Sequence, residues 1–172
     1  MSSAPDIGPN SGPTTGIVIG VGHAERQDDG VGPYVARGLC RRGLPAVVHE
    51  GEGTGLLDQW ESRPACIVVD ALSDAAAPGT MRVFTDFDHP GFARAAFVHS
   101  THRLGVPEAV ALGRALGRLP RRLVVIGITG TAFGFGSGLS APVAVAAEQL
   151  IDRLAAAENA FGDDALAGLV PS

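Results

Sequence analysis

The chain has 172 residues, enough for one domain with a sizeable hydrophobic core. Its net charge of −5 at pH 7 argues against a protein that binds nucleic acid or anionic membranes, because both classes normally carry a basic face. Cys40 and Cys66 are too few for a disulfide framework or a cysteine zinc site. The sequence shows neither a signal peptide nor an apolar run of membrane-spanning length, which predicts a cytoplasmic protein.

Short apolar strands alternate with helices along most of the chain. Residues 1–15 are rich in Ser, Pro, Gly and Thr, which predicts a disordered leader. We expect a single domain over 16–158 and a flexible tail over 159–172. The expected strands and extended runs are 16–20, 46–50, 66–70, 80–85, 95–98 and 123–128, and the expected helices are 30–42, 55–61, 107–119 and 140–157. This alternation predicts an α/β sandwich.

Two of these elements have clear patterns. Leu123–Ile128 is apolar throughout, as expected for a strand covered on both faces of a sheet. The helix over 107–119 is predicted from apolar residues at helical spacing, Ala109, Leu112, Leu116 and Leu119, with Pro120 as its stop.

Three potential metal ligands, Asp29, Asp70 and His102, each follow a short apolar strand. Residues beyond the carboxyl ends of parallel strands converge on one crevice, where open α/β sheets place their sites. Two carboxylates and one imidazole in that crevice would suit a borderline divalent metal.

Each of these residues also has a structural interpretation. Asp28 or Asp29 could cap the following helix, which leaves the other without a structural role. Asp70 could accept backbone N–H bonds from the next turn, and His102 could be a solvated or hydrogen-bonded ring. The sequence also offers His23, His49, His89 and His99 as lower-ranked candidates.

Two other enzyme classes fit the sequence poorly. Gly20-Val21-Gly22 after a strand suggests dinucleotide binding, but Glu25 stands where the fingerprint requires a third glycine, and its charge would repel a pyrophosphate. A serine hydrolase needs Gly-x-Ser-x-Gly directly after a strand, and Gly136-Ser137-Gly138 has neither that spacing nor that position.

Taken together, the motifs resemble those of the hydrogenase maturation endopeptidases, which trim the C-terminus of the large subunit of nickel–iron hydrogenases. The resemblance runs from about Gly16 to Leu154. Its carriers are Val18-Ile19-Gly20-Val21-Gly22, Asp28-Asp29-Gly30-Val31-Gly32, Asp70-Ala71, Ala77-Pro78-Gly79-Thr80-Met81, Ser100-Thr101-His102-Arg103-Leu104-Gly105 and Gly138-Leu139-Ser140.

The resemblance implies a three-layer α/β sandwich around a five-stranded mixed, mostly parallel sheet with helices on both faces. It implies that Asp29, Asp70 and His102 are the catalytic and metal-contacting residues of a peptidase that cleaves one bond in a nickel-loaded hydrogenase precursor. The nickel would belong to the substrate, so no permanent cofactor is expected. The precursor is the expected partner, and the protease is expected to be a monomer.

The sequence departs from the family's usual pattern at three places. His23 stands where Asn is usual, Glu50-Gly51-Glu52-Gly53 is a less regular acidic turn, and Thr129-Gly130 replaces a common Gln or Glu. These differences bear on substrate choice more than on fold. They leave open an alternative, a non-cleaving metal-responsive binding module or chaperone that docks on a hydrogenase precursor.

Overall fold

The structure, a computed structural model, describes residues 15–50, 53–98, 104–167 and 169. The expected leader, apart from residue 15, lies outside these residues, as do His99 and His102. The strands are β1 (Ile17–Val21), β2 (Ala46–His49), β3 (Ala65–Leu72), β4 (Met81–Phe84) and β5 (Arg122–Thr129). The helices are α1 (Val31–Arg41), α2 (Gly53–Trp60), α3 (Pro90–Ala93), α4 (Val106–Ala115), α5 (Ala141–Ala156) and α6 (Asp163–Ala167), and a 3-10 helix, Gln27–Gly30, precedes α1.

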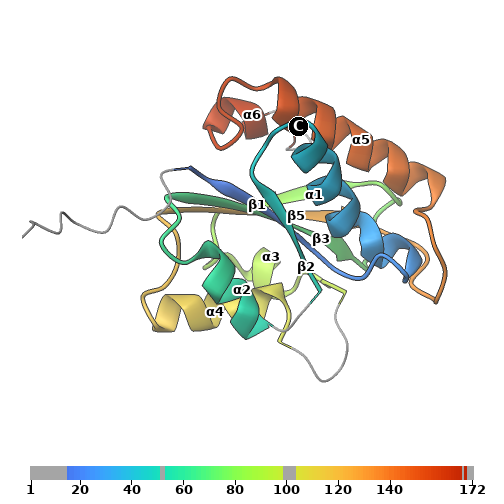
Figure 1. Cartoon of the computed structure of the whole chain (residues 1–172). Coiled ribbons are helices and arrows are strands. Elements are labelled where there is room, and N and C mark those ends of the chain that lie inside the picture. Colours follow the sequence, from blue (N-terminus) through green and yellow to red (C-terminus); the bar gives the residue numbers. More distant parts are fainter. Residues whose placement is uncertain (1–14, 51–52, 99–103, 168, 170–172) are drawn as a thin grey trace, which may run out of the picture.

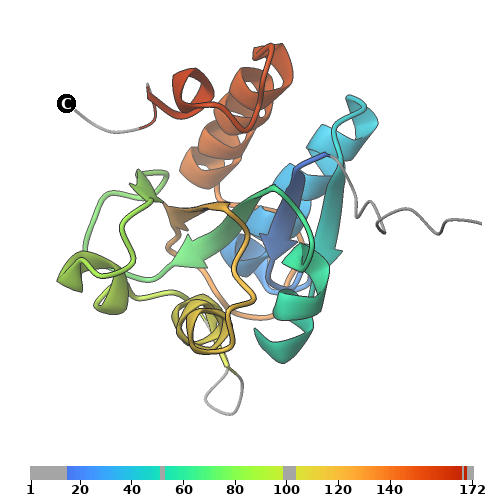
Figure 2. The ribbon, with the colours of Figure 1, turned by 90° about the vertical axis from the view of Figure 1, so that its left-hand side faces the viewer.

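The five strands form one sheet in the order β2-β1-β3-β5-β4 (Figure 1). Four strands are parallel and only β4, at the edge beside β5, runs antiparallel. Figure 2 shows α4 (yellow) and α5 (orange) on opposite sides of the sheet. The predicted three-layer α/β sandwich with a mixed, mostly parallel sheet is confirmed.

Side-chain alternation along β3 explains the two layers, because successive residues of a strand point to opposite faces. Ile67 and Val69 pack in the core beneath α1 and α5, whereas Cys66 and Val68 pack against α2 and α4. A central strand covered on both faces is therefore apolar at nearly every position, and Asp70 is its charged exception.

Helix α4 ends at Ala115, four residues earlier than the apolar spacing predicted. Gly117 has a φ of +65°, which glycine adopts at low cost, and the N–H of Arg118 turns back to the carbonyl of Gly113. Leu116 is therefore 56% exposed and does not extend the buried face of the helix.

Two further segments differ from the expected elements. The run 95–98 forms only a single bridge, between Phe97 and Leu72. The expected flexible tail contains α6, and Leu166 and Leu169 are buried in the same core as α1 and α5. The apolar residues of this segment lie close together over a short stretch, too short to establish a helical period in the sequence, yet they pack in the core.

In the part of the chain that the structure describes, none of the helices combines the length and apolar character needed to cross a bilayer.

Candidate active site

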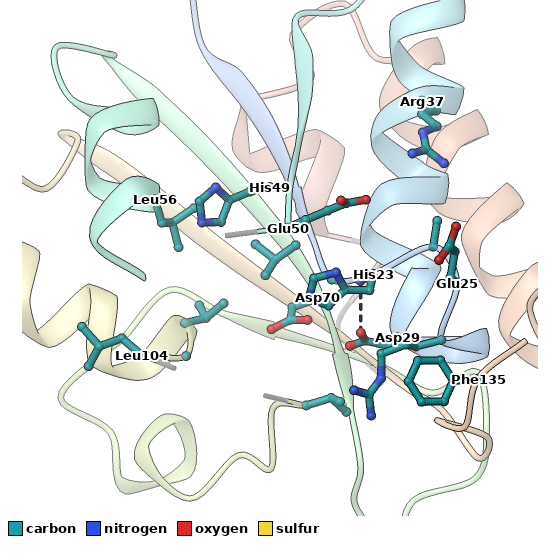
Figure 3. Close-up of a pocket in the computed structure, with 17 residues that line it drawn as sticks. His23, Glu25, Asp29, Arg37, His49, Glu50, Leu56, Asp70, Leu104 and Phe135 are labelled. Carbon is teal, nitrogen blue, oxygen red and sulfur yellow. Dashed lines mark hydrogen bonds between the residues drawn. The ribbon is translucent and has the colours of Figure 1, made fainter. Parts of the chain in front are cut away.

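A cavity of about 700 Å³ opens at the carboxyl ends of β1, β2 and β3 (Figure 3). Parallel strands place their following loops at one edge of the sheet, and these loops form the walls together with residues of α1, α2 and α4. The polar and charged lining residues are His23, Glu25, Arg26, Asp29, Arg37, His49, Glu50 and Asp70. The apolar ones include Val21, Leu56, Val98, Leu104, Val106 and Phe135.

Asp29 is brought into the cavity by the tight turn after β1. Gly22 has a φ of +126°, and a Cβ there would lie 2.0 Å from the backbone oxygen of Asp29, so only glycine permits this approach. The carboxylate accepts a hydrogen bond from the backbone N–H of His23 at 3.0 Å. Burial raises the pKa of Asp29, and the His23 hydrogen bond and the charges of His23 and Arg26 only partly offset it.

Asp70 enters the same cavity from inside β3, which continues for two residues beyond it to Leu72. Its side chain is 1% exposed and accepts a hydrogen bond from the backbone N–H of Ala71 at 2.7 Å. Burial raises the pKa of Asp70 well above its ordinary value, and the negative charge of Asp29 raises it further. The structural interpretation of Asp70 was a carboxylate that accepts backbone N–H bonds from the following residues. The hydrogen bond from Ala71 fits this interpretation, but one such bond does not account for burying a carboxylate.

Asp28 has a different role from the helix cap considered above. Its carboxylate accepts hydrogen bonds from the backbone N–H groups of Thr131, Ala132 and Ser140 and from the Ser140 hydroxyl. It therefore fixes the Gly-rich loop between β5 and α5 to the start of α1. Asp29 lines the cavity, and Asp28 does not.

The structure brings Asp29 and Asp70 together, whereas His102 lies outside the described residues. Val98 and Leu104, the nearest described residues on either side of it, both line the cavity. Within the described ranges no three His, Cys, Asp or Glu side chains form a group that could hold a metal ion.

Several lining residues were missed or ranked low in the sequence analysis. His23 and His49 were spare candidates, and both line the cavity, because His23 lies in the loop after β1 and His49 ends β2. His23 lies between Asp70 and Asp29 in Figure 3, whereas the ring of His49 is directed toward α2 and Leu56.

His89 has a structural role instead, because its Nδ1 accepts a hydrogen bond from the N–H of Gly91 at the start of α3. Phe135 gave no sequence signal at all.

Gly20, one of the glycines that suggested a dinucleotide site, has a packing role together with Gly32. A Cβ on Gly20 would lie 2.0 Å from the carbonyl oxygen of Gly32, and one on Gly32 would lie 2.2 Å from that of Val21. These two glycines allow α1 to approach β1 closely. Asp29 lies just before the N-terminus of α1, where its carboxylate would repel a phosphate group.

Comparison with known proteins identifies the family. Residues 50–157, more than half of the chain, match the HycI hydrogenase maturation protease model. The chain belongs to the hydrogenase maturation protease family. It is therefore a peptidase by family, and both Asp70 and His102 fall inside the matched segment, whereas Asp29 precedes it.

Individual members of this family resemble the chain along much of its length. It is 29% identical to the hydrogenase 2 maturation protease of Escherichia coli over 87% of this chain and 94% of that protein. It is 32% identical to the hydrogenase expression/formation protein HupD of Rhodobacter capsulatus, over 64% of this chain and 55% of that protein.

Solved structures share the fold of this maturation protease. The solution structure of an endopeptidase from Escherichia coli superposes with a TM-score of 0.70 at 22% identity, covering 90% of this chain and 93% of that one. The maturating endopeptidase HybD of the same organism gives a TM-score of 0.66 at 23% identity, covering 82% and 90%.

Proposed function

We propose that this chain is the endopeptidase that removes the C-terminal extension from the nickel-loaded precursor of a nickel–iron hydrogenase large subunit. The observation that carries the proposal is the presence of Asp29 and Asp70 in one cavity at the carboxyl ends of β1 and β3. Membership of the maturation protease family supplies the reaction class, hydrolysis of a peptide bond.

The electrostatics of this pair suit recognition of a cation carried by the substrate. Asp29 and Asp70 are both buried, and the charge of Asp29 disfavours ionisation of Asp70. A divalent ion between them would remove that repulsion. A precursor without nickel leaves both carboxylates unneutralised, and this loss of binding energy discriminates against it.

We assign His102 as the third group of this site, with Asp29 and Asp70, in both catalysis and nickel contact. The assignment is supported by the family motif that His102 matches and by the positions of Val98 and Leu104 in the cavity wall.

In this proposal the protease holds no permanent metal or cofactor, because the nickel ion arrives with the precursor. The ion polarises the scissile carbonyl or the attacking water, and one of the two aspartates accepts a proton from that water. The products are the shortened large subunit, with a new carboxylate, and the released peptide, with a new amine.

We further propose that the protease acts as a monomer in the cytoplasm, with the precursor as its partner and without nucleic acid or membrane. The net charge of −5 supports the exclusion of nucleic acid. Light scattering on the purified chain tests whether its mass in solution is that of a monomer.

The experiment incubates the purified protein with nickel-loaded precursor and follows the mass of the large subunit. We expect a loss of mass at its C-terminus, and no loss with Asp29→Ala, Asp70→Ala or His102→Ala. Asp152→Asn is the matched control, because Asp152 forms an exposed ion pair with Arg42, just beyond the end of α1, and neither residue lines the cavity. Binding of the precursor without any loss of mass would instead identify a non-cleaving docking module.

A further inference from the structure

We propose that Phe135 is a specificity-determining residue that binds an apolar side chain of the precursor peptide as the peptide enters the cavity beside Asp29. The inference rests on the proposed function and adds to it a contact for the peptide itself, separate from the nickel-reading carboxylates.

Phe135 is 90% exposed, more than any other large apolar side chain of the described residues. It lines the cavity that contains Asp29 and Asp70. An aromatic ring left in water contributes almost nothing to folding, whereas the same ring covered by a ligand contributes one of the largest apolar contacts available to a side chain.

The loop that presents Phe135 is fixed in place. Besides the hydrogen bonds to the Asp28 carboxylate, the N–H of Gln27 donates to the carbonyl of Gly136 at 3.0 Å, and the N–H of Gly136 donates to the carbonyl of Glu25 at 2.9 Å. Gly136 has a φ of +152°, which glycine permits. The ring is thus carried by a short backbone pairing with the segment that leads directly to Asp29.

The guanidinium group of Arg26 lies over one face of the Phe135 ring. The guanidinium carbon lies 5.7 Å from the centre of the Phe135 ring, and Nη2 donates to the carbonyl oxygen of Phe133 at 3.4 Å. A side chain that is already positioned loses little conformational entropy when a partner binds, so more of the contact energy appears as affinity.

The opposite rim of the cavity is also apolar. Leu104 is 43% exposed, and Figure 3 shows Leu104 and Phe135 on opposite sides, with Asp70 and Asp29 between them. Val98 and Val106 are further apolar residues of the cavity lining. A peptide that crosses the carboxylates would therefore pass between two apolar surfaces, which select an aliphatic or aromatic side chain close to the scissile bond.

Cleavage kinetics on nickel-loaded precursor test this with Phe135→Ala, Phe135→Leu and the control Val145→Ala, whose side chain is 57% exposed on α5 outside the cavity lining. We expect Phe135→Ala to raise KM about tenfold with little change in kcat, and Phe135→Leu to fall between it and wild type. Val145→Ala should change neither value. An unchanged KM for Phe135→Ala, a loss confined to kcat, or an equal effect of Val145→Ala would overturn the proposal.

Alanine substitution of each apolar precursor residue near the scissile bond identifies the contact. One substitution should raise KM for the wild-type protease and leave KM of Phe135→Ala unchanged, because the two changes remove the same contact. If the effects of the protease and precursor substitutions on KM add at every position, the contact between Phe135 and the precursor is refuted. If wild type leaves the loaded precursor intact, the proposed function fails, and the same comparisons of Phe135→Ala are then made on the dissociation constant of the precursor. If the loaded precursor does not bind the wild-type protein, both the proposed function and the proposed role of Phe135 are refuted.

Discussion

Asp28 and Asp29 are adjacent in the chain, yet their carboxylates face different parts of the molecule. Asp28 is fully buried and accepts four hydrogen bonds from residues 131–140, whereas Asp29 faces the cavity with one backbone hydrogen bond. The first fixes the loop that carries Phe135, and the second belongs to the proposed site. Substitutions at the two positions should therefore have different effects.

Asp28→Asn should lower the free energy of unfolding by about 2 kcal/mol at neutral pH, because charge-assisted hydrogen bonds to the loop are weakened. Burial alone would raise the pKa of Asp28, but its hydrogen bonds hold the pKa below the ordinary value of 3.8. This stabilisation is present above pH 3.8 and is lost as the pH falls through the lower native pKa. Denaturant unfolding across acid pH should show the difference from wild type shrinking, and a difference that grows toward low pH would contradict the account.

Asp70→Asn should stabilise the free protein while abolishing cleavage. Burial and the charge of Asp29 raise the pKa of Asp70, so its ionised form opposes folding. We therefore expect Asp70→Asn to raise the free energy of unfolding at neutral pH. Because the native pKa exceeds 3.8, the wild-type penalty grows as the pH rises above that value, and the gain should grow with it. A less stable Asp70→Asn would show that the carboxylate serves the fold.

Gly32→Ala should cost about 2–3 kcal/mol and disturb the site. The added methyl would lie 2.2 Å from the carbonyl oxygen of Val21 and 2.5 Å from that of Val69, and neither backbone atom can move freely. Gly43→Ala is the control, because Gly43 has open space and only its φ of +83° opposes alanine, at about 1 kcal/mol. Equal melting temperatures for the two variants would argue against close packing of α1 on the sheet.

Leu166→Ala tests the packed C-terminal segment. Leu166 is 5% exposed in the core beneath α5, so truncation should cost about 2 kcal/mol. The exposed Val145→Ala should change stability by less than about 0.5 kcal/mol. Thermal unfolding of both variants provides the comparison, and a silent Leu166→Ala would restore the interpretation as a loose tail.

Much of the fold was predictable because the central strands are buried on both faces and are apolar at almost every position. Leu123–Ile128 is the clearest case. The end of α4 was not predictable from spacing, since Leu116 and Leu119 continue the apolar pattern past a glycine that turns the chain away. The C-terminal segment was missed because burial of Leu166 depends on partners far away in the chain.

In the candidate site, too, some features were predictable from the local sequence and others depend on residues far away in the chain. The positions of Asp29 and Asp70 follow from where strands end in a parallel sheet, which is a local signal. The role of Asp28 does not, because its partners lie more than 100 residues away. The exposure of Phe135 likewise depends on how its loop is fixed and has no counterpart in composition or periodicity.

Nickel dependence tests the central claim most directly. Precursor with and without nickel is incubated with the same amount of purified protease, and the mass of the large subunit is followed, together with nickel binding by the free protease. We predict that only the nickel-loaded precursor is cleaved and that the free protease binds nickel weakly. In this account the substrate supplies the cation that neutralises the paired carboxylates. A protease purified with one tightly held metal that also cleaves unloaded precursor would be an ordinary metalloprotease, and the account of Asp29, Asp70 and His102 as readers of nickel insertion would be wrong.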